Sequence, residues 1–113
     1  MLKINGHDWR IMLTSSNHPQ LMRPNGSFTL GCCNSENKTI YIVEGLNRTY
    51  FKKVLCHELV HASMFSYGIE LNEQQEEVLA DLIATYGQEI LNITNSIFCR
   101  LVECRNENKG CLC

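Results

Sequence analysis

The segment Val54-Leu-Cys-His-Glu-Leu-Val-His-Ala62 places His57 and His61 four residues apart, with Glu58 directly after the first histidine. Residues four apart on an α-helix share one face, with Cβ atoms about 5–6 Å apart. Both imidazoles can therefore bind one ion at zinc–nitrogen distances of about 2.0–2.1 Å. Glu58 lies one helical step further round, where its carboxylate can reach a water in the metal's open position. This spacing predicts a helix that supplies two metal ligands and a general base.

The same residues also have a simpler interpretation. A motif with three fixed letters arises by chance, and helical histidines are more often core or surface residues than ligands. Two histidines and a carboxylate inside a buried helix would need partners, however, because unpaired buried polar groups are costly. The flanking residues do predict a buried helix, since they are apolar on nearly all sides: Val54, Leu55, Leu59, Val60, Ala62, Met64 and Phe65. A metal ion is the simplest partner, so the flanks favour the metal site.

The composition is typical of a globular protein with one modest core. The chain has 113 residues, of which 44% are hydrophobic and 19% charged. A formal net charge of −2 provides no basic surface for nucleic acid, and no apolar run approaches the roughly 20 residues that span a bilayer. The first residues lack the apolar core and cleavage site of a signal peptide. We therefore expect a cytoplasmic protein with no nucleic-acid or membrane partner.

Seven cysteines could suggest a disulfide scaffold, but their number is odd. A cytosol keeps thiols reduced, so we interpret them mostly as free thiols. None shows the C-x-x-C spacing of a structural zinc site. Four crowd the C-terminus, namely Cys99, Cys104, Cys111 and Cys113. We expect one domain over residues 1–105, followed by a flexible cysteine-containing tail over residues 106–113.

The sequence before the motif predicts a small antiparallel sheet. Residues 2–13 alternate loosely around Asn5-Gly6, which is a hairpin turn signal. Residues 28–30 predict a brief strand. Residues 39–43 predict the strongest strand, because they are rich in β-branched and aromatic side chains.

Capping signals predict where two helices begin and end. Asn47 can cap the motif helix, which should end near Tyr67 because Gly68 favours the left-handed conformation that stops a helix. Asn72 and Gln75 form a capping box for a second helix. Its apolar residues keep helical spacing to about Cys104, with a break near Asn92 as the alternative.

The second helix is expected to supply the third ligand. Glu77, Asp81 and Gln88 share a face with Ala80 and Ala84, whose small side chains let the motif helix approach. Glu77 would complete a set of two histidines and one glutamate, which leaves the fourth zinc position for water. Asp81, one turn later, could accept the free N–H of a ligand histidine and fix its tautomer.

Glu76 is a competing ligand in the neighbouring register. Both acids could instead be solvated carboxylates that favour a helix N-terminus. Glu77 is favoured as the ligand, because the residue four positions after it is the acid Asp81. The residue four positions after Glu76 is Ala80.

His57-Glu58-Leu-Val-His61 followed by Glu77-Val-Leu-Ala-Asp81 resembles the H-E-x-x-H and E-x-x-A-D motifs of gluzincin metallopeptidases. Over residues 39–90 the chain is most similar to small phage and prophage members related to ImmA/IrrE-type proteins. The resemblance implies a cytoplasmic protein of a bacterium or a phage-infected host cell. No histidine follows His61, which argues against SprT-like relatives with a third histidine. No helix-turn-helix region is recognised, which argues against a direct role in regulating a repressor.

The resemblance implies an α+β, minimal zincin-like fold. In this fold a small antiparallel sheet packs on an active-site helix, and a long second helix carries the third ligand. Residues 39–43 would form the sheet edge beside the cleft, where a peptide could pair. One catalytic Zn²⁺ would be bound by His57, His61 and Glu77, with Glu58 as general base and Asp81 supporting a ligand histidine.

We therefore expect a zinc metallopeptidase that hydrolyses a peptide or protein substrate. One alternative is a zinc-stabilised phage or prophage protein-binding module without proteolytic activity. Another is an interaction domain that binds no metal and holds both histidines in its core. Four residues could stabilise the oxyanion, none of them favoured over the others: Tyr67, Tyr86, His7 and His18. The pattern specifies no oligomeric state.

Overall fold

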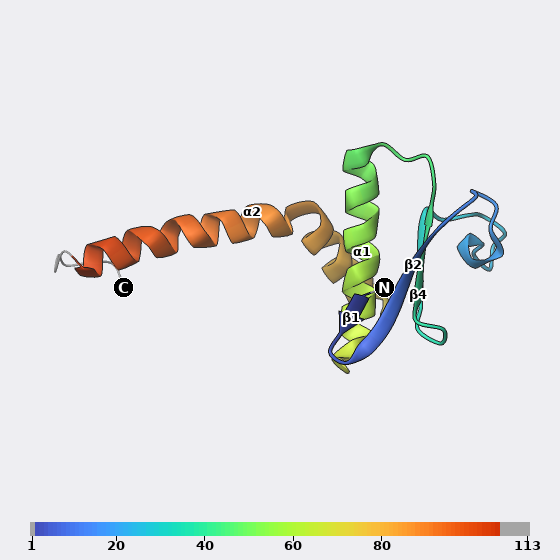
Figure 1. Ribbon diagram of the computed structural model, residues 1–113, viewed down its shortest axis with the longest axis horizontal. Helices are drawn as coiled ribbons and strands as arrows, with labels where there is room; N and C mark the ends of the chain where they lie inside the picture. Colours follow the sequence, from blue (N-terminus) through green and yellow to red (C-terminus); the bar gives the residue numbers. More distant parts are fainter. Residues whose placement is uncertain (1, 107–113) are drawn as a thin grey trace.

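The computed structural model describes residues 2–106, which begin with a β-hairpin (Figure 1). β1 (Leu2–Ile4) and β2 (His7–Thr14) pair antiparallel through the expected two-residue turn. Asn5 and Gly6 both have positive φ, at 44° and 83°, as the tight turn that matches strand twist requires. The Nδ2 of Asn5 donates to the carbonyl oxygen of Ser66 at 2.9 Å, which anchors the turn to a helix end.

The sheet has four strands in the order β1-β2-β4-β3. β3 (Gly31–Asn34) pairs antiparallel with β4 (Thr39–Val43), but β4 runs parallel to β2. The sheet is therefore mixed, and the prediction of an antiparallel sheet was wrong. The reason is the long connection over residues 15–38, which includes the short 3₁₀ helix η1 (Pro19–Leu21) and β3 and returns β4 beside β2 in the same direction.

β4 is an inner strand, because it lies between β2 and β3, and the edge strand on its side of the sheet is β3. All five residues of β4 are buried, as expected for a continuous apolar strand covered on both faces. The prediction that residues 39–43 form the sheet edge was therefore wrong. Residues 28–30 do not form the predicted strand either, since Phe28 makes only an isolated bridge with Met22. The residues Gly-Cys-Cys-Asn have weaker β propensity than Phe-Thr-Leu, so packing rather than propensity places β3.

Both helices begin as their capping residues predict. α1 (Arg48–Ser66) starts with the amide of Tyr50 donating to Asn47 Oδ1 at 2.9 Å, and Gly68 has the expected positive φ of 68°. α2 (Glu73–Asn106) starts with the predicted capping box. The side-chain oxygens of Asn72 and Gln75 each accept a hydrogen bond from the backbone N–H of the other residue.

α2 has no break near Asn92 and includes Asn106, two residues beyond the predicted end. The rest of the expected tail lies outside the described residues. Neither helix within residues 2–106 combines the length and hydropathy that a bilayer crossing requires.

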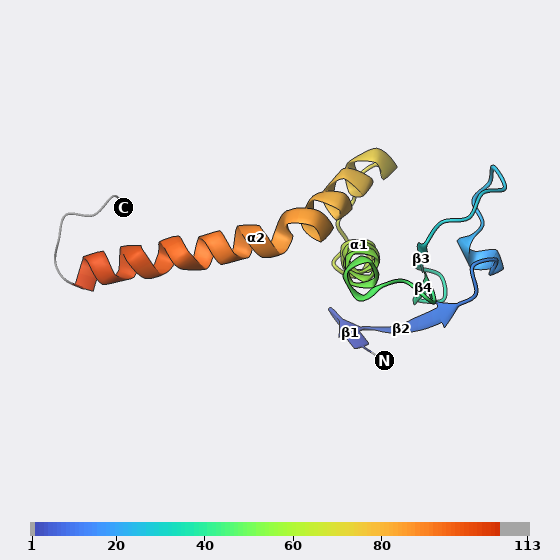
Figure 2. The same ribbon diagram turned by 90° about the horizontal axis from the view of Figure 1, so that it is seen from above.

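α1 lies between the sheet and the start of α2 (Figure 2). Its residues Val54 and Ala62 join Trp9, Ile40 and Ile42 in the main core. The other face of β4 packs on η1. The α+β class is confirmed, and α1 is held against the sheet on one side while its other side meets α2. The zincin-like assignment stays a prediction.

Candidate metal centre

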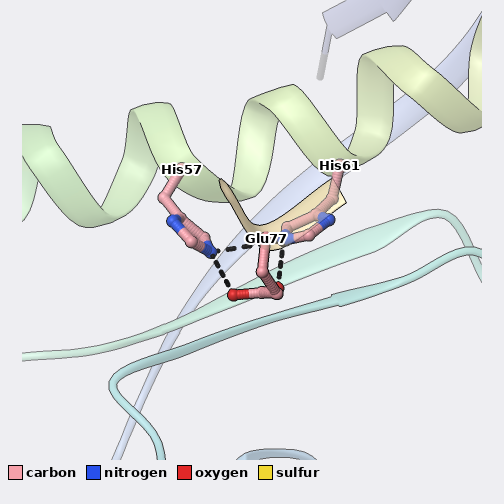
Figure 3. Close-up of side chains that lie close together, drawn as sticks. All are labelled: His57, His61 and Glu77. Atoms are coloured by element: carbon pink, nitrogen blue, oxygen red, sulfur yellow. Dashed lines mark hydrogen bonds and ion pairs between the residues drawn. The ribbon is translucent and has the colours of Figure 1, made fainter. Parts of the chain in front are cut away.

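His57 and His61 lie on one face of α1, on the side that meets α2 (Figure 3). Their Nε2 atoms are 3.2 Å apart. The side chains are only 19% and 15% exposed. The i, i+4 spacing thus brings two imidazole nitrogens together inside the molecule, as the sequence predicts.

Glu77 projects from the second turn of α2 toward both rings (Figure 3). Its Oε1 lies 2.8 Å from His61 Nε2, and its Oε2 lies 3.3 Å from His57 Nε2. Two ligands about 2.0–2.1 Å from a tetrahedral zinc are roughly 3.3 Å apart, which is close to the separations of these atoms. The structure therefore brings His57, His61 and Glu77 into a group that could hold a metal ion.

Each histidine also has its own carboxylate at Nδ1. Asp81 Oδ1 lies 3.0 Å from His57 Nδ1, and Glu76 Oε1 lies 2.6 Å from His61 Nδ1. A carboxylate that accepts the Nδ1–H fixes the tautomer and leaves the Nε2 lone pair for a metal. Asp81 is thus placed as predicted.

The contact of Glu76 with Nδ1 of His61 was not predicted from the sequence. Glu76 was considered only as a competing ligand, but its carboxylate contacts Nδ1 rather than Nε2 of His61. Adjacent helical residues differ by about 100° in direction, so Glu76 and Glu77 can reach opposite edges of one ring. Two ligand histidines need two Nδ1 partners, and counting those partners would have pointed to a second acid.

The acids around His61 change its protonation. Burial alone would lower the pKa of His61, but the hydrogen bond to Glu76 and the charges of Glu58 and Glu77 outweigh it and raise the pKa. The carboxylates around the two imidazoles therefore favour a positive charge at this position, as a cation site requires.

Glu58 lies on the side of α1 that faces β3 and is only 8% exposed. Burial raises the pKa of Glu58, and the nearby imidazoles of His57 and His61 offset part of that increase. A carboxyl with a raised pKa is a better proton acceptor near neutral pH. The pKa of the predicted general base is thus shifted in the direction that this role would require.

Gly31 allows β3 to pass this close to Glu58. A Cβ atom at position 31 would lie 2.8 Å from Val54 Cγ1 and 3.1 Å from both Cγ and Oε2 of Glu58. Any larger residue would push the strand or the carboxylate away. The role of this glycine depends on a contact between distant segments, so the sequence pattern did not indicate it.

A cleft of about 1150 Å³ connects these groups. One wall is β3 with the loop before it, and the other is formed by the facing sides of α1 and α2. None of the four oxyanion candidates lines it. Tyr67 and Tyr86 are exposed, His7 packs edge-on against Phe65, and His18 stacks on Tyr41. Three polar side chains from the segment before β3 do line the cleft, namely Gln20, Arg23 and Thr29.

Two cysteines on the β3 wall should be unreactive. Burial, with the charge of Glu58 second, raises the pKa of Cys33 to about 12 and also raises that of Cys32. Because the thiolate is the reactive form, we expect iodoacetamide at pH 8 to modify Cys33 at least about 100-fold more slowly than the exposed Cys99. Mass spectrometry of timed digests measures this, and the difference should vanish in denaturant. Equal rates in the folded protein would contradict the burial of β3 against α1.

The carboxylates at Nδ1 should strengthen metal binding without touching the metal. We expect Glu76→Gln and Asp81→Asn each to weaken zinc affinity by about 10–100-fold. Glu76→Gln should lower zinc affinity more than Asp81→Asn, because Glu76 is 28% exposed and makes the shorter contact, whereas Asp81 is 70% exposed. Competition with a chromogenic chelator measures both. Glu73→Gln, an exposed acid on the same turn as Glu76, is the control. If Glu76→Gln bound zinc as tightly as this control, the hydrogen bond would have no such role.

No family model, curated protein or solved structure matches this chain. The resemblance to gluzincin metallopeptidases therefore stays a prediction that rests on the two motifs. A functional proposal for this chain therefore rests on the geometry of the site.

Proposed function

We propose that this chain is a zinc metallopeptidase that hydrolyses peptide bonds, with Glu58 as general base. The observation that carries the proposal is the convergence of Glu77 on the Nε2 atoms of His57 and His61 beside the buried carboxylate of Glu58. Two imidazoles and one carboxylate form the set of three ligands found in catalytic zinc sites that keep a position open. A purely structural site would instead be closed by a fourth protein ligand.

Different residues would perform different steps of the hydrolysis. Zinc held here would lower the pKa of a water molecule toward about 7 and polarise the substrate carbonyl. Glu58 would take a proton from that water and pass it to the nitrogen of the leaving amine. Glu76 and Asp81 keep the histidine rings oriented, so the ligand atoms need little reorganisation during the reaction.

The substrate that fits this cleft best is an extended peptide. β3 is one of the two edge strands and lines the cleft, so its outer backbone groups are available to a further strand. A peptide paired there would bind through main-chain hydrogen bonds, and its scissile bond would lie between β3 and the two histidines. Arg23 on the same wall adds a cationic side chain next to the substrate.

Metal removal tests the proposal. We expect the purified protein to contain about one zinc ion per chain by elemental analysis. Dialysis against a zinc chelator should abolish cleavage of a quenched fluorescent peptide library, and stoichiometric zinc should restore it. Protein isolated without chelators that still contains no metal would overturn the metal site. Zinc-loaded protein that cleaves no protein or peptide would favour the non-proteolytic binding module.

A further inference from the structure

The part of α2 that extends beyond the metal centre is apolar on one side and packs against nothing in the described chain. Figures 1 and 2 show that only the start of α2 lies beside α1, while the rest projects away from the body. Every residue from Gln88 to Arg100 is exposed. Because helical stability in proteins comes mostly from packing an apolar face, this half of the helix lacks the contact that would hold it.

Five apolar residues follow one another along this helix at a regular spacing. They are separated by three, four, three and four residues and are 38–53% exposed: Ile83, Tyr86, Ile90, Ile93 and Ile97. We call them the α2 stripe. Alternating steps of three and four give the 3.5-residue period of a coiled-coil seam, in which each side chain fits between residues of a facing helix with the same repeat.

We propose that two copies of this chain pair in an antiparallel manner through the α2 stripe. The repeat is self-complementary, so the partner that it fits best is an identical helix. A contiguous exposed apolar surface on this scale marks an interaction site rather than ordinary solvent-exposed surface.

The available apolar surface is the size of a small protein–protein interface. Nine apolar side chains of α2 are 38–64% exposed: Val78, Leu82, Ile83, Tyr86, Ile90, Leu91, Ile93, Ile97 and Phe98. The six between Tyr86 and Phe98 lie on the part of α2 that projects from the body. At roughly 200 Å² for a large side chain, they expose on the order of 600 Å², which matches the roughly 600 Å² per partner that smaller specific interfaces bury.

The charges next to the stripe select the antiparallel orientation. Arg100 occupies the next position of the repeat after Ile97. In a parallel pair Arg100 would face Arg100 of the second copy, and such like-charge contacts are unfavourable. In an antiparallel pair centred near residue 95, Ile93 faces Ile97 of the second copy and Arg100 comes beside Glu89. Two complementary charge contacts then flank the apolar centre.

This pairing leaves the metal centre accessible. Asp81 and Ile90 are nine residues apart, which is half a turn around the helix axis, so the stripe and the carboxylates of the site lie on opposite sides of α2. The antiparallel arrangement also places the two bodies at opposite ends of the pair, since each is attached to the N-terminal end of its α2. The second copy therefore holds α2 without covering the cleft.

Sedimentation equilibrium of the full chain at micromolar to 100 µM concentration tests the pairing. The expected species has twice the 13.0 kDa mass of one chain. Ile90→Asp and Ile97→Asp should each shift it to monomer. Asn92→Asp, which adds the same charge on the polar side and keeps the oxygen that accepts from Gln88, should remain a dimer. Zinc content, measured in parallel, should stay unchanged in all variants and shows that the body is folded.

The orientation has its own test. Arg100→Glu and Glu89→Arg should each raise the dimer dissociation constant several-fold, and the double variant should restore it. A double variant no tighter than either single one would overturn the antiparallel pairing. A wild-type chain that stays monomeric at 100 µM, forms trimers or larger species, or binds anionic lipid vesicles as a monomer would overturn the proposal as a whole. So would an Ile97→Asp variant that remains a dimer.

Discussion

Replacing Glu58 by glutamine is expected to lower the rate of peptide cleavage by about 10²–10⁴-fold, the usual contribution of a general acid–base residue. Glutamine has nearly the same shape but cannot accept a proton from water. The zinc content should stay at one ion per chain, because Glu58 is not among the three converging ligand atoms. Activity against a quenched fluorescent peptide and elemental analysis of the same preparation measure both quantities.

The melting temperature of the Glu58→Gln variant shows whether the variant remains folded. Burial raises the pKa of Glu58, so the charged form is disfavoured in the folded protein. Removing that charge should leave the melting temperature unchanged or higher, and a loss of activity cannot then be attributed to unfolding. Glu70→Gln, an exposed acid that also lines the cleft, should keep its activity. Cleavage at the wild-type rate by the Glu58 variant would remove this residue from the mechanism.

Glu77→Ala should have the largest effect on metal binding. It removes one of three ligands, so we expect zinc affinity to fall by more than the roughly 10–100-fold that accompanies loss of a supporting partner. Without Glu77, the Nε2 atoms of His57 and His61 would be the remaining ligands in the group. Isothermal titration with zinc, or competition with a chelator of known affinity, measures the difference.

Glu73→Ala is the matched control for this change. Glu73 is an exposed acid on α2, one turn before Glu77, so its replacement also removes one negative charge near the start of this helix. The control should bind zinc as tightly as the wild-type chain. Retention of full affinity by Glu77→Ala would mean that the contacts of Glu77 with the two rings are only ion pairs.

The features that the sequence predicted correctly are encoded within a few residues of one another. The turn at Asn5-Gly6, the caps at Asn47 and Asn72, and the shared face of His57 and His61 each follow from backbone preferences over at most five residues. Glu77 was placed by combining two such local patterns with the assumption that the helices pack side by side. The structure has that packing.

The features that the sequence missed depend on contacts between distant segments. β4 runs parallel to β2 because of the path that the connection over residues 15–38 takes, and the composition of β2 and β4 does not encode that path. Gly31 is explained only by how close β3 comes to Glu58. Glu76 was considered only as a competing ligand, because spacing along one helix does not fix which edge of a ring on another helix an acid reaches.

The metal centre is confined to a short part of the chain. The three proposed ligands, the acids at their Nδ1 atoms and the proposed base all lie on α1 and α2, between positions 57 and 81. Contacts that are close in sequence form early, because little loop entropy is lost in closing them. α1 and α2 can therefore pack together before the sheet is complete. A zinc ion bound between them, as proposed, should then accelerate the formation of native structure during refolding as well as stabilise the product.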